Sequence, residues 1–117
     1  MITERLMNKN IGSAGSFPIL GPTKNIPMPK SYRGVVDVKL TNATGTALNS
    51  LVARIQGRLS PEQEFVDVLL NNSNDEFQLN INIPGLTFED IQLYPEMRVK
   101  VISNSFINAD LTVFLGH

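Results

Sequence analysis

The sequence predicts an all-β protein: a single antiparallel β-sandwich of about six to seven strands that follows an extended, irregular N-terminal arm. From residue 35 onward, short segments rich in β-branched residues alternate between apolar and polar positions. Clusters of Asn, Ser, Gly and Pro separate these segments at short intervals. No stretch of this region has convincing helical periodicity. We therefore expect an arm over residues 1–34 and a β-sandwich domain over residues 35–117.

Six segments have the composition or the alternation of strands. They are residues 35–40, 51–59, 65–70, 77–83, 97–102 and 109–115. In the second segment, apolar residues alternate with Arg54, Gln56 and Arg58, which predicts one buried face and one solvated face. Residues 87–92 contain Thr and Asp at capping-box spacing, and we expect a short turn or 3₁₀ segment there.

The same alternation assigns individual side chains to faces of the sandwich. In segment 77–83, Leu79 and Ile81 are expected to point into the core. Segments 35–40 and 109–115 are expected to be sheet edges that could accept a strand from a neighbour. Four basic residues alternate with apolar neighbours and are expected on an exposed outer face: Arg54, Arg58, Arg98 and Lys100.

The arm combines prolines with spaced apolar residues. Four prolines within residues 18–29 remove backbone donors and favour extended backbone. Residues 1–34 hold five basic residues and one acidic residue, a net charge of +4, whereas residues 35–117 carry −5. A frayed terminus would account for the irregularity, but a flexible spacer would lack apolar anchors. We favour an arm that orders against a neighbouring subunit through Phe17, Ile19, Leu20, Lys24, Ile26, Met28 and Lys30.

The composition excludes much catalytic chemistry. The chain has no Cys and a single His, His117, so thiolate sites and an oriented His base both lack their usual donors. The polar run over residues 71–76 offers oxygen ligands, but it lacks the order of an EF-hand loop and is typical of a turn. We expect no catalytic residue, no metal ion and no cofactor.

Charge and hydropathy bear on partners and localisation. The net charge of −1 disfavours nucleic acid as a partner. The longest apolar stretches are far shorter than the roughly 20 residues of a membrane-spanning helix, so we expect no membrane partner. The N-terminal residues lack the apolar region of a signal peptide, so synthesis in the host cytoplasm is expected.

Residues 50–116 resemble a group of small β-sandwich virion proteins of tailed bacteriophages. The resemblance rests on the strand LVARIQGRLSP at residues 51–61, followed by FVDV at residues 65–68, and on LYPEMRVKV at residues 93–101, followed by a last strand that ends with FLG at residues 114–116. It implies a non-enzymatic structural protein, of the capsid decoration or cement type, with the major capsid protein or other virion proteins and copies of itself as partners. It also implies a location in the virion.

Two alternatives remain open from the sequence. The first is another position in the virion, in the neck, the tail or the fibre base. The second is a carbohydrate-binding sandwich, in which Tyr32 and Tyr94 would supply the aromatic surface for sugars.

Overall fold

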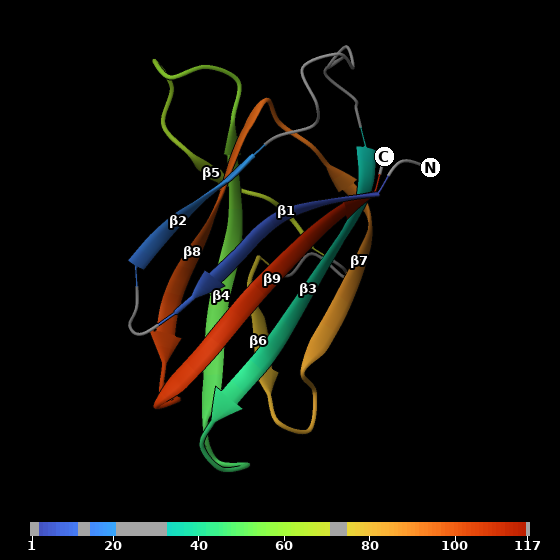
Figure 1. Ribbon diagram of the computed structural model, residues 1–117. Coiled ribbons are helices and arrows are strands. Elements are labelled where there is room, and N and C mark those ends of the chain that lie inside the picture. The colour runs from blue at the N-terminus through green and yellow to red at the C-terminus, as the bar shows by residue number, and fades with distance from the viewer. Residues whose placement is uncertain (1–2, 12–14, 21–32, 71–74, 117) are drawn as a thin grey trace.

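Nine strands in two antiparallel sheets make up the described part of the chain (Figure 1). The computed structural model describes residues 3–11, 15–20, 33–70 and 75–116, with the backbone alone for residues 3–9 and 15–20. Within these ranges there is no helix long and apolar enough to cross a membrane. The predicted all-β sandwich is confirmed.

The two sheets are built from different parts of the chain. The first has the order β1 (Thr3–Asn10), β9 (Asn108–Gly116), β3 (Arg33–Thr44) and β7 (Gly85–Gln92). The second has the order β2 (Gly15–Leu20), β8 (Glu96–Asn104), β4 (Ser50–Arg58) and β5 (Val66–Asp67). The short strand β6 (Phe77–Asn80) pairs with the first residues of β4, and β5 pairs with later ones.

The core lies between the inner faces of the two sheets. Alternating residues of the central strands β3, β9, β4 and β8 point inward and exclude water. The side chains that are wholly buried on these strands are Val38, Ala109, Leu111, Val113, Leu115, Leu51, Ala53, Ile55 and Val99. The alternation in segments 51–59 and 109–115 therefore predicted the buried face correctly over most of their length.

The turn expected over residues 87–92 is wrong, because these residues belong to β7. The reason is a β-bulge: Gly34 pairs with Ile91, and Val36 pairs with Phe88, so β7 has one residue more than β3. The bulge includes Asp90, whose φ is 54°, and its carboxylate accepts a hydrogen bond of 2.6 Å from Arg33 Nε. The buried residues of β7 thus lie three apart, and the period of two disappears from the sequence.

Segment 77–83 is also shorter than predicted. The strand β6 ends at Asn80, whose side-chain oxygen accepts a 2.7 Å hydrogen bond from the backbone N–H of Ile83 and closes a turn. Leu79 is buried as expected, but Ile81 lies in the turn and is exposed. The inward orientation predicted for Ile81 is therefore wrong, because the strand and its alternation end at Asn80, the residue before it. Segment 65–70 likewise forms only the two paired residues of β5.

The N-terminal region contains two strands that the sequence did not predict. The strand β1 pairs with β9, and β2 pairs with β8, so residues 3–10 and 15–20 are regular, not irregular, and add to different sheets. Between them, Ile11 is wholly buried in the core, and its N–H donates a 2.7 Å hydrogen bond to Ala109 O. As a result, β9 and β3 are interior strands, and the expectation that segments 35–40 and 109–115 are edges is wrong.

The opposite environments of Leu79 and Ile81 give a direct test of the inner face. Replacing Leu79 with Ala leaves a cavity in the core and should lower the free energy of unfolding by about 2–5 kcal/mol. Ile81→Ala removes an exposed side chain and should change it by about 0.5 kcal/mol or less. Urea denaturation of the two variants measures the difference. Equal losses would contradict the placement of β6 and its turn.

Candidate interaction surfaces

A polar network covers the outer face of the second sheet around Asp67. Because Asp67 pairs with Gln56 across β5 and β4, its carboxylate lies beside the polar side chains of β4. It accepts hydrogen bonds from Arg54 Nη1 at 3.0 Å and from Gln56 Nε2 at 2.8 Å. The other end of the Gln56 amide accepts a 2.7 Å hydrogen bond from Arg98 Nε. One amide therefore connects β5, β4 and β8.

Two arginines of this face contact the same aromatic ring. The guanidinium carbons of Arg58 and Arg98 lie 4.3 Å and 4.1 Å from the centroid of the Phe65 ring, within the range of a cation–π contact. Arg58 also forms an ion pair with Glu96 through its Nε. Phe65, which follows the β4–β5 turn, is thereby held over the sheet by both guanidinium groups.

Acidic residues surround Arg54 on the same face. Glu76 Oε2 lies 3.5 Å from Arg54 Nε, a longer contact than the 3.0 Å hydrogen bond to Asp67. The negative charge of Asp75 is the largest cause that raises the pKa of Arg54 above its ordinary value. The carboxylates of Asp67 and Glu76 add to this effect, and partial burial opposes it.

The four basic residues predicted for an exposed outer face differ in their surroundings. They do lie on the outer face of the second sheet, but Arg54, Arg58 and Arg98 are partly buried in the network, and only Lys100 among the four is exposed. The expectation of full exposure is wrong for the three arginines, because the neighbouring carboxylates and the Phe65 ring cover them. Alternation identified the face, whereas these contacts depend on the pairing of β5 with β4.

Tyr94 packs at one end of the core, where the chain passes from β7 to β8. Its ring lies against Gly57 of β4: a Cβ atom at position 57 would stand 2.3 Å from Tyr94 Cδ2 and 2.6 Å from Cγ. Such distances are far below any van der Waals contact, so only glycine fits beneath the ring. Gly57 of β4 thus leaves the space that the Tyr94 ring occupies.

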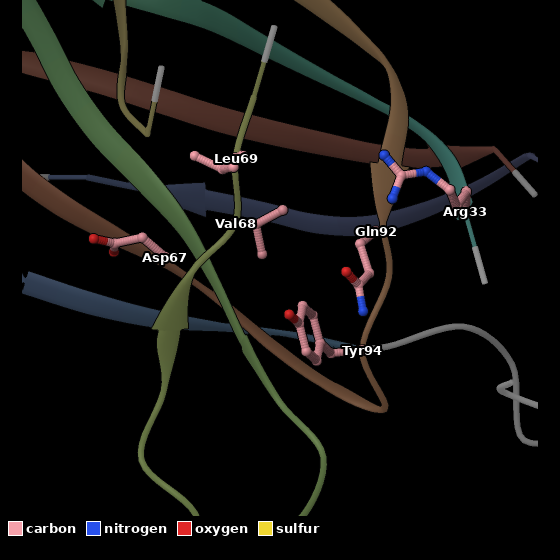
Figure 2. Close-up of a pocket in the computed structure, with 6 residues that line it drawn as sticks. All are labelled: Arg33, Asp67, Val68, Leu69, Gln92 and Tyr94. Atoms are coloured by element: carbon pink, nitrogen blue, oxygen red, sulfur yellow. The ribbon is translucent and has the colours of Figure 1, made fainter. Parts of the chain in front are cut away.

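Two pockets are lined in part by Tyr94. The first, of about 220 Å³, is lined by Arg33, Asp67, Val68, Leu69, Gln92 and Tyr94. Figure 2 shows Tyr94 and Gln92 on the β7 side of this pocket and the residues that follow β5 on the opposite side. The second, of about 510 Å³, is lined by Gly57, Arg58, Leu59, Gln63, Glu64, Val66 and Tyr94. Among the described residues that line them, Tyr94 is common to both pockets.

The residues predicted to bind a partner fall into two groups. Phe17, Ile19 and Leu20 lie in β2, at the edge of the second sheet. The remaining ones lie outside the described residues: Lys24, Ile26, Met28 and Lys30. Tyr32 and His117 lie outside them too, as do residues 71–74 of the polar run. Over the part of the chain that the structure describes, no group of three His, Cys, Asp or Glu side chains could hold a metal ion.

Comparison with known proteins gives no family. No protein-family description and no curated protein matches the chain. Among solved structures, the mitogen of Yersinia pseudotuberculosis is 12% identical at a TM-score of 0.46, over 98% of this chain and 85% of that one. The SPBc2 prophage-derived protein YomS is 11% identical at a TM-score of 0.45, over 100% of this chain and 96% of that one. The tomato aspermy virus structure is 11% identical at a TM-score of 0.44, over 95% of this chain and 75% of that one. These values assign neither a family nor a function.

The close approach of Tyr94 to Gly57 gives a second prediction. Gly57→Ala should destabilise the domain, because the new methyl group meets the ring, and the double variant Gly57→Ala/Tyr94→Ala should recover part of the loss. Gly85→Ala is the matched control, since its Cβ would lie 3.4 Å from the nearest atom, Val38 O. Thermal melts of the three variants measure the effect. If Gly57→Ala melts like Gly85→Ala, the ring does not pack as described.

Proposed function

We propose that this protein is a non-enzymatic structural component of a bacteriophage virion, a head decoration or cement protein that binds the capsid shell through its N-terminal arm and its sandwich. One observation carries the proposal. The N-terminal segment supplies one edge strand of each sheet, β1 beside β9 in the first and β2 beside β8 in the second. The resemblance of residues 50–116 to small virion proteins is the second support.

Edge strands are the part of a sandwich that another chain can extend. An edge strand leaves one row of backbone N–H and C=O groups unpaired, and a strand from a neighbour can pair with that row. Pro18 lies within β2, and proline within sheets is confined largely to edge strands. Because Pro18 supplies no N–H, a neighbouring strand would pair with the other residues of β2. Since β1 and β2 follow each other closely in the chain, a neighbour that contacts this segment would engage both sheets.

The charge of the arm indicates the kind of surface it would contact. Residues 1–34 carry a net charge of +4, and the remainder of the chain carries −5. An acidic surface on the capsid shell would attract the arm, and the attraction would fall as salt screens it. Copies of the protein itself offer such an acidic surface as well, so the same arm could join sister copies on the shell.

The virion assignment can be tested on particles. Particles released by lysis of the host that encodes this chain, purified on a density gradient, should contain the protein in many copies by quantitative mass spectrometry. The full-length protein, added to shells from which it has been stripped, should rebind, and its apparent affinity should fall between 50 and 500 mM salt by at least about tenfold. Absence from purified particles would contradict the proposal. Binding that does not change with salt would contradict the role of the basic arm.

A second candidate function, glycan binding, is favoured by the position of Tyr94. Its ring borders two pockets, and Asp67, Gln92 and Arg33 bring polar groups to the smaller one. Aromatic rings with neighbouring amide and carboxylate groups are suited to the apolar faces and hydroxyl groups of sugars. NMR titration of the protein with a panel of mono- and disaccharides should then shift the signals of these residues. No shift at millimolar sugar would exclude this candidate.

A further inference from the structure

The strand β1 leaves an open row of backbone groups at the edge of the first sheet. The N–H of Ile11 donates to Ala109 O, so the odd-numbered residues of β9 bond toward β1. Their partners in β1 do not bond outward, because the backbone groups of successive residues alternate in direction. The N–H and C=O groups directed away from β9 belong to the residues opposite its even-numbered positions: Thr3, Arg5, Asn8 and Asn10.

The other described edges of the two sheets are less suited to a second strand. The strand β2 contains Pro18, which has no N–H to donate, and β5 has only two residues. The strand β7 carries Glu89 and Asp90 and no basic residue, so two copies of β7 would bring like charges together. At Asp90 the φ of 54° also interrupts the extended backbone. Of the described edges, β1 is therefore the best suited to pairing.

Two charged residues of β1 occupy positions on the inner face of the sheet. Glu4 pairs with Leu115 and Lys9 pairs with Leu111, and both leucines are wholly buried in the core. Residues directly opposite one another in a sheet lie on the same face. Inward charged residues on an edge strand normally discourage pairing, because an added strand would enclose them without a counter-charge. A strand that pairs with β1 must therefore bring a basic residue to Glu4 and an acidic residue to Lys9.

We propose that this strand is β1 of a second copy of the chain. In an antiparallel pair of two β1 strands, with the two-fold axis between Leu6 and Met7, Glu4 of each copy stands opposite Lys9 of the other. Each inner-face charge then has a counter-charge, and the contact is closed because the same strand is used by both copies. The first sheets of the two copies join into one sheet, with four described strands from each.

The bulge in β1 permits this register. In a regular strand that pairs with its own copy, outward rows match only between residues an even number apart, whereas Glu4 and Lys9 are five apart. In the pairing with β9 an extra residue separates Arg5 from Met7, which moves the outward row by one position. Thr3 then meets Asn10 and Arg5 meets Asn8, so the backbone rows and the charges match in the same register. A shift of two residues in either direction would separate the charges.

Charge reversal tests this inference on the full-length protein. In sedimentation equilibrium from about 1 to about 300 µM, the parent protein should dimerise, and Glu4→Lys and Lys9→Glu should each raise the dissociation constant at least about tenfold. The double variant Glu4→Lys/Lys9→Glu exchanges the charges and should return to within about threefold of the parent value. Glu89→Lys is the matched control, because it makes the same change on β7, and its dissociation constant should equal that of the parent. Thermal melts verify that each variant is folded.

Amide hydrogen exchange locates the contact on the strand. Exchange at Arg5 and Asn8 should slow as the dimer forms, because their outward N–H groups become donors to the second copy. A protein that stays monomeric at every concentration would overturn the inference. Single variants that associate like the parent, or a double variant as weak as the single ones, would overturn it too.

The inference does not depend on the virion role, and the two can fail separately. A monomeric protein that rebinds to stripped shells would overturn the pairing of β1 and leave the proposed function in place. A dimer that responds to charge reversal, from a protein absent from purified particles, would support the pairing of β1 and contradict the proposed function.

Discussion

The inner faces of the two sheets depend on one constraint, the strict alternation of side chains along the interior strands. Leu111, Val113 and Leu115 of β9 and Leu51 and Ile55 of β4 are all wholly buried. A slip of one residue in the pairing of β9 with β3, or of β4 with β8, would turn these side chains to solvent and bring polar neighbours inside. Burial of this face at about 25 cal/mol per Å² fixes the registers, and the registers in turn place Gln56 beside Asp67 and Gly57 beneath Tyr94.

Bulges and turns then determine which side chains depart from the alternation of buried and exposed positions. The bulge that contains Asp90 lets β7 bury residues three apart, and Arg33 holds it through a hydrogen bond from its Nε. On β8, Ile102 is the extra residue between the partners of Val52 and Ala53. On β3, Asn42 adopts a φ of 51°, and its amide donates to Asp110, which lowers the pKa of that carboxyl. These local departures occur near the ends of the sandwich, where the exposed apolar side chains also lie.

The two ends of the molecule differ in chemistry although they belong to the same two sheets. One end carries ion pairs and the pockets beside Tyr94. The other carries turns without a charged residue, at residues 45–49, 81–84 and 105–107, in which Leu48, Ile81, Ile83 and Ile107 are exposed. The N-terminal strands run along one side and provide an edge for each sheet.

The sequence alone determined the fold class and most of the inner face, because alternation and turn residues are local signals that the chain carries at each strand. It did not reveal β1 and β2, because residues 3–10 and 15–20 lack an alternation of apolar and polar residues, and these strands exist only through pairing with β9 and β8 at the far end of the chain. It also placed Ile81 on the wrong side and left the partners of Arg54 and Arg98 unknown. Those features depend on a turn bond from Ile83 to Asn80 and on the pairing of β5 with β4. Contacts between residues distant in sequence follow from the tertiary structure, because no local pattern encodes them.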